Sequence, residues 1–245
     1  MPAPPVLLKN DSSLLFMLCD IQERLAPKMA DTDVLINAAT KLVKASHLFG
    51  STLLVTEQYP KGLGKTVGEI PVIAELNPSR VHVVEKTEFP MVVKETKEII
   101  EKHEQFIVFG CEAHICVLQT VAKLLEMGKT RIFVASDATG SMSIADHADA
   151  MATLRQWGVT VLPCDAYLFQ LIHGKNDDYF KQVSQIVKDG LAPPPPLGLL
   201  VEPKTPTSPQ MPATPPCSPA LGGSGMGMPL SPGSPQNSDK FVVAS

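Results

Sequence analysis

Cysteine is scarce in this chain, and its few residues follow no regular spacing. The five thiols stand at positions 19, 111, 116, 164 and 217. This arrangement gives neither a ladder of disulfides nor the paired spacing of a zinc site. It excludes a small secreted scaffold held by disulfides and favours a reducing compartment.

An excess of basic charge and a long apolar run are also missing. Lys and Arg number 21 against 25 Asp and Glu, a formal net charge of −4, so the basic surface of a nucleic-acid-binding protein is not expected. No apolar stretch reaches the length of a membrane span. The first residues, "MPAPPVLLKNDSS", have no basic region before an apolar core and are not rich in Arg, so neither a secretory signal nor a transit peptide is expected. We expect a cytoplasmic location, with a mitochondrial or other intracellular compartment left open.

Composition divides the chain into three parts. Residues 12–190 have the composition of a globular domain, preceded by a short N-terminal arm at 1–11. From 191 to 245 the chain is rich in Pro, Gly and Ser and almost uncharged, a composition that does not build a hydrophobic core. Prolines recur every third residue from Pro203 to Pro215, the period of polyproline II. We therefore expect a disordered tail, a reading compatible with a ligand for a proline-recognition module.

Within the globular part, apolar runs of strand length alternate with segments of helical spacing. The expected strands cover residues 14–20, 51–60, 80–86, 105–110, 130–138 and 159–164. The main helices between them are expected at 31–50, 91–104, 112–128 and 144–158, and a loop rich in Gly and Pro at 59–71. Most of these strands are continuously apolar, as in parallel sheets covered on both faces. The sequence predicts an α/β fold, a three-layer sandwich with a six-stranded, mostly parallel sheet flanked by helices on both faces.

In such a sheet the functional crevice lies at the carboxyl ends of the strands. Asp20, Lys86 and Cys116 all fall at that edge. Each alone is more often a turn, solvated or packing residue, but together they form a chemical set. A helix N-terminus and a nearby ammonium favour a thiolate, and a carboxylate between them transfers the proton. Backbone N–H groups at the helix start are suited to hold an oxyanion.

Three motifs carry a resemblance to the isochorismatase-like cysteine hydrolases, closest to the eukaryotic isochorismatase-domain-containing proteins. "LLFMLCDIQ" resembles the strand-1 Asp motif of this family, "VVEKTEFP" its Lys segment and "FGCEAHICVLQT" its nucleophile segment. The resemblance implies a catalytic triad of Asp20, Lys86 and Cys116. It also implies a cis peptide bond between Cys111 and Glu112, with the backbone around Cys111, Glu112 and Cys116 shaping an oxyanion hole.

Two departures from the family pattern bear on the substrate. Nicotinamidases of this family bind a metal through an Asp-x-His after the second strand, where this chain has "TEQYP" (56–60), so we expect no metal and no cofactor. Members that cleave isochorismate have an Arg two residues after the Lys, where this chain has Glu88, which disfavours isochorismate. The expected substrate pocket is lined by Gln22, Gln58, Tyr59, Phe89 and His114. His114 suits a helix-packing role as well as a catalytic one.

The sequence thus predicts a hydrolase that attacks a small amide, ester or related carbonyl compound through Cys116. The competing hypothesis is a non-catalytic binding or assembly protein that keeps the fold. The intact Asp, Lys and Cys favour the enzyme, and iodoacetamide reactivity of Cys116 discriminates between the two. Family members usually form symmetric oligomers, so we expect a homo-oligomer. Neither a nucleic acid nor a membrane is expected as a partner.

Overall fold

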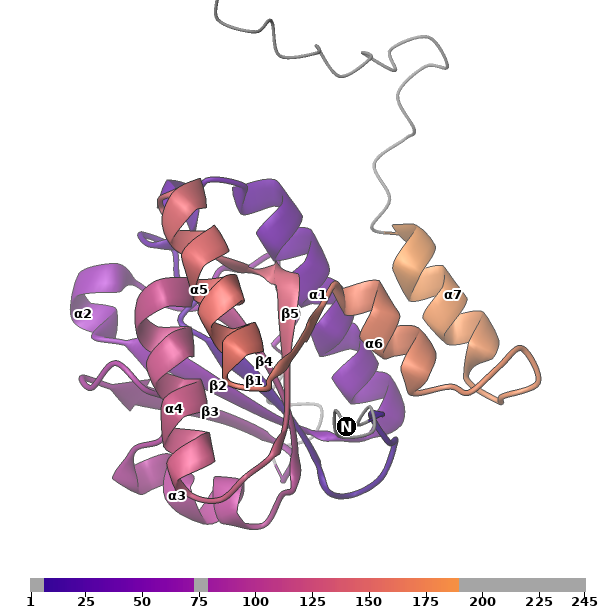
Figure 1. Cartoon of the computed structure of the whole chain (residues 1–245). Helices are drawn as coiled ribbons and strands as arrows, with labels where there is room; N and C mark the ends of the chain where they lie inside the picture. The colour runs from indigo at the N-terminus through magenta and orange to yellow at the C-terminus, as the bar shows by residue number, and fades with distance from the viewer. Residues whose placement is uncertain (1–6, 73–78, 190–245) are drawn as a thin grey trace, which may run out of the picture. The chain divides into compact units, whose positions relative to one another are not determined.

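The structure, a computed structural model, describes residues 7–72 and 79–189, and the predicted C-terminal tail at 191–245 lies outside them. A six-stranded sheet has the order β3-β2-β1-β4-β5-β6, and every adjacent pair is parallel (Figure 1). The strands are β1 (Leu14–Cys19), β2 (Thr52–Gln58), β3 (Val81–Lys86), β4 (Gln105–Cys111), β5 (Arg131–Gly140) and β6 (Thr160–Leu162). The predicted six-stranded α/β fold is confirmed, and the sheet is wholly parallel.

Helices cover the two faces of the sheet as separate groups. One face packs against α1 (Thr32–Phe49), α6 (Cys164–Gln170) and α7 (Phe180–Asp189). The other packs against α3 (Lys94–Glu101), α4 (Leu118–Glu126) and α5 (Ile144–Gln156). The predicted loop at 59–71 contains one short helix, α2 (Pro60–Leu63), which Pro60 starts because its fixed φ suits the first helical position. Within the described residues, no helix is both long and apolar enough to cross a membrane.

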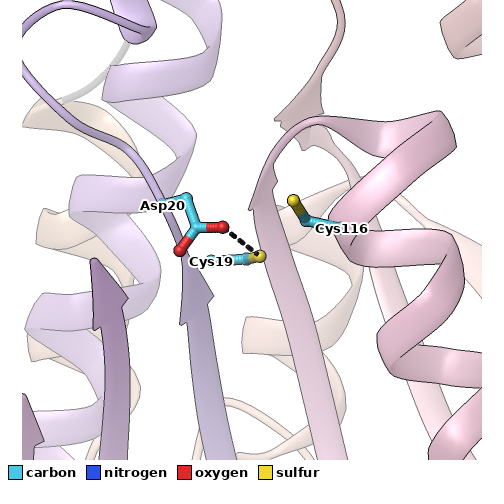
Figure 2. A group of neighbouring side chains, drawn as sticks. All are labelled: Cys19, Asp20 and Cys116. Carbon is cyan, nitrogen blue, oxygen red and sulfur yellow. Dashed lines mark hydrogen bonds between the residues drawn. The ribbon is translucent and has the colours of Figure 1, made fainter. Parts of the chain in front are cut away.

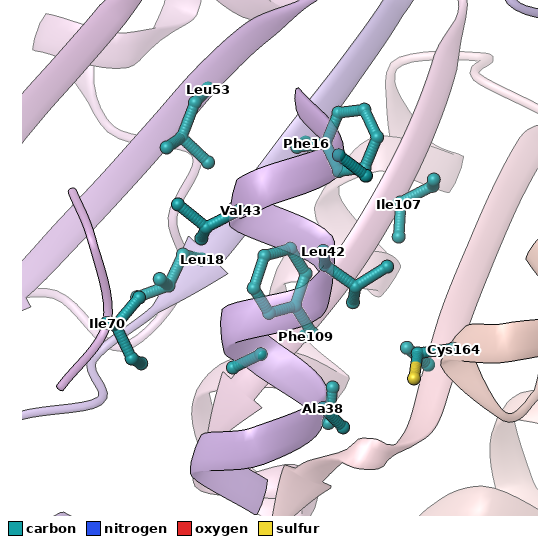
Figure 3. Close-up of a cluster of buried hydrophobic side chains, with 14 of the residues drawn as sticks. Phe16, Leu18, Ala38, Leu42, Val43, Leu53, Ile70, Ile107, Phe109 and Cys164 are labelled. Carbon is teal, nitrogen blue, oxygen red and sulfur yellow. The ribbon is translucent and has the colours of Figure 1, made fainter. Parts of the chain in front are cut away.

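Strand β1 shows why its sequence is continuously apolar. All six of its residues are buried, and their side chains alternate between the two faces. Phe16 and Leu18 join the cluster around α1, with Leu42 and Phe109 (Figure 3), whereas Leu15 and Met17 join the cluster under α4. A central strand buried on both sides has no position for a solvated side chain, and the first polar residue, Asp20, comes where the strand ends.

The described part of the predicted N-terminal arm, residues 7–11, contacts the rest of the fold. Leu8 is buried, and its N–H donates to Oε1 of Gln170 at 3.3 Å. The N–H of Lys9 donates to Oε1 of Gln105 at 2.9 Å. These residues therefore cover the amino end of the sheet, where β4 begins.

Gly110 is required where β4 passes the end of β1. Its φ is +128°, and a Cβ on it would lie 2.0 Å from the carbonyl oxygen of Cys19.

Gly110→Ala is expected to lower the free energy of unfolding by about 2–3 kcal/mol, because the backbone conformation is disfavoured for alanine and the added Cβ clashes with a rigid backbone neighbour. Urea unfolding measures this loss. Gly158→Ala is the control: its φ is +82° with no atom within 4 Å, and we expect a loss of only about 1 kcal/mol. Equal losses in the two variants would show that the Cys19 contact is unimportant.

Candidate active site

The candidate site lies beside the point in the sheet where the direction in which successive strands are added changes. The chain runs from β1 outward through β2 to β3, and then returns to place β4 on the other side of β1. A crevice forms at the carboxyl ends of the two strands flanking such a switch point. Asp20 follows β1, Lys86 ends β3, and Cys116 lies in η3 (Ala113–Val117), the π-helical segment between β4 and α4. The topology thus brings to one edge three residues that are far apart in the sequence.

The three side chains are in close proximity. Lys86 Nζ donates to Asp20 Oδ2 at 2.7 Å, and both side chains are fully buried. Cys116 Sγ, Cys19 Sγ and a carboxylate oxygen of Asp20 all lie within 4.8 Å of one another (Figure 2). The Asp20 backbone has a φ of +52°, a region that Asp tolerates better than most residues. This left-handed turn ends β1 at the site.

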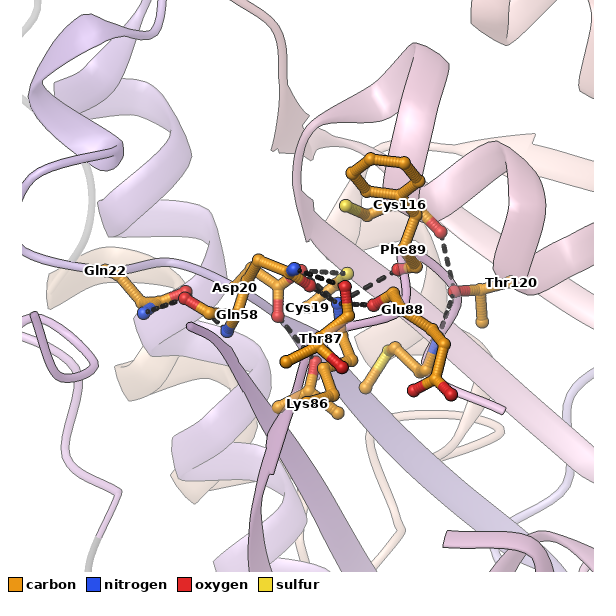
Figure 4. Close-up of polar contacts among 12 residues, drawn as sticks. Cys19, Asp20, Gln22, Gln58, Lys86, Thr87, Glu88, Phe89, Cys116 and Thr120 are labelled. Atoms are coloured by element: carbon orange, nitrogen blue, oxygen red, sulfur yellow. Dashed lines mark hydrogen bonds and ion pairs between the residues drawn. The ribbon is translucent and has the colours of Figure 1, made fainter. Parts of the chain in front are cut away.

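A network of hydrogen bonds holds the Asp20–Lys86 ion pair in place. Asp20 Oδ1 accepts from Thr56 Oγ1 at 2.8 Å. Lys86 Nζ also donates to Gln58 Oε1 at 2.7 Å and to the carbonyl oxygens of Glu88 and Phe89 at 3.1 and 2.9 Å (Figure 4). A buried ion pair is tolerated when its remaining donors and acceptors are satisfied, and here they are.

Burial and polar contacts act in opposite directions on the two groups of the pair. Burial raises the pKa of Asp20 overall, although the Lys86 ammonium and the Thr56 hydroxyl act to lower it. Burial by itself lowers the pKa of Lys86, but the Asp20 carboxylate beside it acts in the opposite direction, and the pKa is raised overall. Lys86 therefore stays protonated at neutral pH and serves as the fixed positive charge of the site.

Cys116 differs from the other described cysteines in its thiol pKa. A hydrogen bond with Cys19 lowers the pKa of Cys116, and the Lys86 ammonium and a backbone hydrogen bond from Glu112 act in the same direction against burial and the Asp20 charge. Burial raises the pKa of Cys19, Cys111 and Cys164 instead. Cys116 is 6% exposed, and the other three are 0% exposed. Its thiolate is thus the most accessible and the most favoured of the four.

The turn before Cys116 has the geometry that the family resemblance implies. The peptide bond between Cys111 and Glu112 is cis. Cys111 packs in the cluster on the α1 face, whereas Cys116 belongs to the cluster on the opposite face. The N–H groups of Ile115 and Val117 both donate to the carbonyl oxygen of Glu112, at 3.2 and 3.1 Å. A π-helical turn of this kind often occurs at a functional site.

Thr120 fixes the first turn of α4 from within the core. Its Oγ1 donates to the Cys116 carbonyl at 2.6 Å and accepts from the N–H of Met91 at 2.9 Å. Thr120→Val keeps the shape and is expected to lower the free energy of unfolding by about 1–3 kcal/mol, because it leaves buried backbone groups unpaired. Thermal or urea unfolding measures the loss.

Thr153→Val is the matched control for that change. Thr153 Oγ1 donates to the carbonyl four residues earlier, that of Asp149, at 2.8 Å, but this bond is exposed to solvent. Water replaces it, so we expect a loss of less than about 0.5 kcal/mol. A Thr120→Val variant as stable as Thr153→Val would contradict the role given to Thr120.

Of the five predicted pocket residues, two amides have positioning roles. Gln22 is fully buried; it donates to the carbonyls of Gln58 and Gly64 at 3.0 and 2.7 Å and accepts from the Gln58 N–H at 2.8 Å. Gln58 joins β3 to the site, since its Nε2 donates to the Thr87 carbonyl and its Oε1 accepts from Lys86. Gln22 thus holds the 58–64 loop, and Gln58 holds the ammonium of Lys86.

The other three predicted pocket residues are at least partly exposed. Tyr59 and Phe89 are exposed by more than half of their surface. Tyr59 lines a surface cavity of about 570 Å³ that also borders Lys86 and Glu88. His114 Nδ1 lies 3.0 Å from Ser141 Oγ and 3.5 Å from Glu112 Oε2. The structure therefore gives His114 neighbours on the β5–α5 connection, and its role toward a substrate stays a prediction.

Cys19 was not among the predicted site residues. It precedes Asp20, and its thiol donates to Asp20 Oδ2 at 3.5 Å. Its position next to Asp20 is the one feature of the sequence that could have placed Cys19 at the site, because an apolar strand gives no reason to single out one small residue.

The cluster of Cys19, Asp20 and Cys116 contains ligand types that also bind metals, but its charges do not suit a cation. One Asp20 oxygen accepts from Lys86 and the other from Thr56. An ammonium 2.7 Å from the carboxylate already supplies the positive charge that a metal ion would bring. Residues 56–60, at the end of β2, offer no Asp-x-His pair either. These side chains are therefore arranged as an ion pair beside a thiol, and not as a set of metal ligands.

Comparisons with known proteins identify the family of this chain. A family model described as "Isochorismatase domain" matches residues 14–165. Isochorismatase domain-containing protein 2A of Mus musculus is 33% identical over 192 residues, which are 78% of this chain and 88% of that protein. Isochorismatase domain-containing protein 1 of Danio rerio is 32% identical over 182 residues, which are 73% of this chain but only 62% of that protein, less than two thirds of its length.

Solved structures show the same fold. A MAR1 ribonuclease from Caenorhabditis elegans has a TM-score of 0.69 at 31% identity, with 79% of this chain and 97% of that chain covered. The YcaC gene product of Escherichia coli, described as an octameric hydrolase of unknown specificity, has a TM-score of 0.67 at 20% identity, with 77% and 95% covered. The family model covers more than half of the chain, so the chain belongs to the isochorismatase-like hydrolase family.

Proposed function

We propose that this protein is a cysteine hydrolase that cleaves a small amide, ester or related carbonyl compound through a covalent intermediate on Cys116. The observation that carries the proposal is the buried Asp20–Lys86 pair beside a thiol whose pKa is lowered. The partly accessible thiol of Cys116 lies within 4.8 Å of the Asp20 carboxylate. Membership of a hydrolase family supports the same reaction class.

The geometry supports a two-step reaction. The Cys116 sulfur attacks the substrate carbonyl, and Asp20 takes the thiol proton and passes it to the leaving group. A thioester on Cys116 results. Asp20 then removes a proton from a water molecule, which attacks the thioester and releases the acid and the free thiol. Lys86 stays protonated throughout and keeps the Asp20 carboxylate aimed at Cys116.

The reaction also needs hydrogen-bond donors for the oxyanion, and we assign this role to backbone N–H groups at the η3 turn. The N–H groups of Glu112 and Cys116 are proposed to hold the oxyanion that forms on the carbonyl oxygen. The backbone hydrogen bond from Glu112 toward the Cys116 thiol supports this assignment, because that donor already faces the reacting sulfur. Cys111 is buried behind the turn and shapes it.

The test is a screen of small amides and esters followed by mass spectrometry of the whole protein. We expect a substrate to leave an acyl group on Cys116 that hydroxylamine removes, as it does from thioesters. An unmodified Cys116 with the alkylation rate of an ordinary thiol, together with no turnover, would instead support the non-catalytic binding protein.

Self-assembly is part of the same proposal. Val34, Met142 and Ile144 are large apolar side chains exposed by more than half, and Val34 and Ile144 line one surface hollow. Such a patch fits a surface covered by a second copy of the chain. Light scattering is expected to give a mass larger than that of the monomer, and a monomer mass at tens of micromolar would contradict it.

A further inference from the structure

Cys19 is a second thiol at the site that the hydrolytic mechanism does not use. It ends β1, and it lies opposite Gly110 of β4 in the parallel register. Its side chain is fully buried, yet its Sγ lies within 4.8 Å of Cys116 Sγ. Figure 2 shows the sulfur atoms of Cys19 and Cys116 near the Asp20 carboxylate.

The other described cysteines do not share this arrangement. Cys19 and Cys116 belong to the same apolar cluster, on the α4 face of the sheet. Cys111 and Cys164 belong to the cluster on the α1 face. Cys111 is five residues from Cys116 in sequence, but the sheet separates their side chains. Among the described cysteines, the fold thus gives Cys116 one thiol neighbour on its own face.

We propose that Cys19 and Cys116 form a reversible disulfide when a hydroperoxide oxidises Cys116. The proposal adds a modification site to the proposed function, and it rests on that function only for Cys116 being the reactive thiol. A disulfide needs the two sulfurs at about 2.05 Å, so the side chains must rotate toward each other and the first turn after β4 must adjust. Cys116 lies in the π-helical turn η3, outside the regular part of α4.

The chemistry balances in two steps. The Cys116 thiolate attacks the outer peroxide oxygen and breaks the O–O bond, which gives a sulfenic acid on Cys116 and an alkoxide that takes up a proton. The Cys19 sulfur then attacks the Cys116 sulfur, and hydroxide leaves. Asp20, whose Oδ2 lies 3.5 Å from Cys19 Sγ, takes the Cys19 proton and passes it to the hydroxide to form water. Two thiols lose two electrons, and the peroxide is reduced to an alcohol and water.

The disulfide would have a protective consequence. Further peroxide converts a sulfenic acid to sulfinic and sulfonic acids, which thiol reductants do not reverse. Cys19 reacts with the sulfenic acid before that happens, and the resulting disulfide is converted back to the Cys116 thiol by a reductant. Cys19 is well placed for this role because it is buried and remains a thiol until Cys116 is oxidised next to it; burial raises its pKa.

The experiment treats the full chain with hydrogen peroxide, blocks remaining thiols, and maps the peptides without reduction. We expect a Cys19–Cys116 cross-linked peptide, a protein lighter by two hydrogens, and loss of Cys116 alkylation that dithiothreitol restores. In Cys19→Ser, which keeps a hydrogen-bond donor beside Cys116, the same treatment is expected to give sulfinic and sulfonic Cys116, which dithiothreitol does not restore. Cys164→Ala is the control variant, and its cross-link is expected to form as in the wild type.

Several results would overturn the proposal. They are a Cys116 that peroxide does not modify, sulfinic Cys116 in the wild type without a cross-link, and a cross-link from Cys116 to any other cysteine. Acylation of Cys116 in the reduced protein separates this test from the hydrolase proposal. Acylation without a cross-link contradicts only the disulfide proposal, and a cross-link without acylation contradicts only the hydrolase proposal.

Discussion

Replacing Cys116 with alanine is expected to abolish hydrolysis of any substrate that the wild type cleaves. Removal of a nucleophile that forms a covalent intermediate lowers kcat by at least about 10³-fold, because no neighbouring group replaces the attacking atom. The folded state is expected to tolerate the change, since alanine replaces one small side chain of the cluster with another. Steady-state kinetics and a melting curve on the same sample separate lost chemistry from lost structure.

Cys164→Ala is the control for this substitution. Cys164 is a buried thiol on α6, and burial raises its pKa well above the ordinary range. Since it packs on the α1 face, we expect wild-type kinetics from this variant. A Cys116→Ala protein that keeps more than about a tenth of the activity would disprove the nucleophile assignment.

The proximity of the three candidate site residues could be predicted from the sequence because it depends on sheet topology. A continuously apolar run such as Leu14–Cys19 needs cover on both faces, and both faces of β1 are covered. Residues directly after such strands meet at one edge, and Asp20, Lys86 and Cys116 do so. This prediction required only that the strands be parallel and that β1 and β4 be central.

The supporting residues did not follow from the sequence, for a physical reason. Gln22 and Gln58 looked like pocket-lining amides, but their amides bond to partners 36 and 28 residues away. Amides serve both roles equally well, and only the path of the 58–64 loop decides between them. Cys19 is similar: on an apolar strand its thiol resembles any small side chain until the turn after β4 places Cys116 beside it.

Lys86→Met is expected to lower the free energy of unfolding by about 3–5 kcal/mol, because it leaves Asp20 buried without its partner. The loss has a defined pH dependence. Burial already raises the pKa of Asp20 and Lys86 opposes this, so the pKa rises further in the variant. A carboxyl with a raised folded pKa stabilises the fold below its unfolded pKa and loses that contribution as the pH rises through the folded value. The deficit is therefore expected to shrink as the pH falls from about 8 to about 5.

Alkylation of Cys116 gives a second measurement on the same variant. The Lys86 ammonium lowers the pKa of the Cys116 thiol, so its removal raises that pKa and slows the reaction of Cys116 with iodoacetamide at neutral pH.

Lys102→Met is the control for the loss of stability, since Lys102 contacts Glu98 at the same 2.7 Å distance but on an exposed helix surface. An exposed pair of this kind contributes less than about 1 kcal/mol. Combining Asp20→Asn with Lys86→Met removes the unpaired carboxylate, and the double variant is expected to be more stable than Lys86→Met alone. Equal stabilities for the Lys86→Met and Lys102→Met proteins would show that the buried pair does not hold the site together.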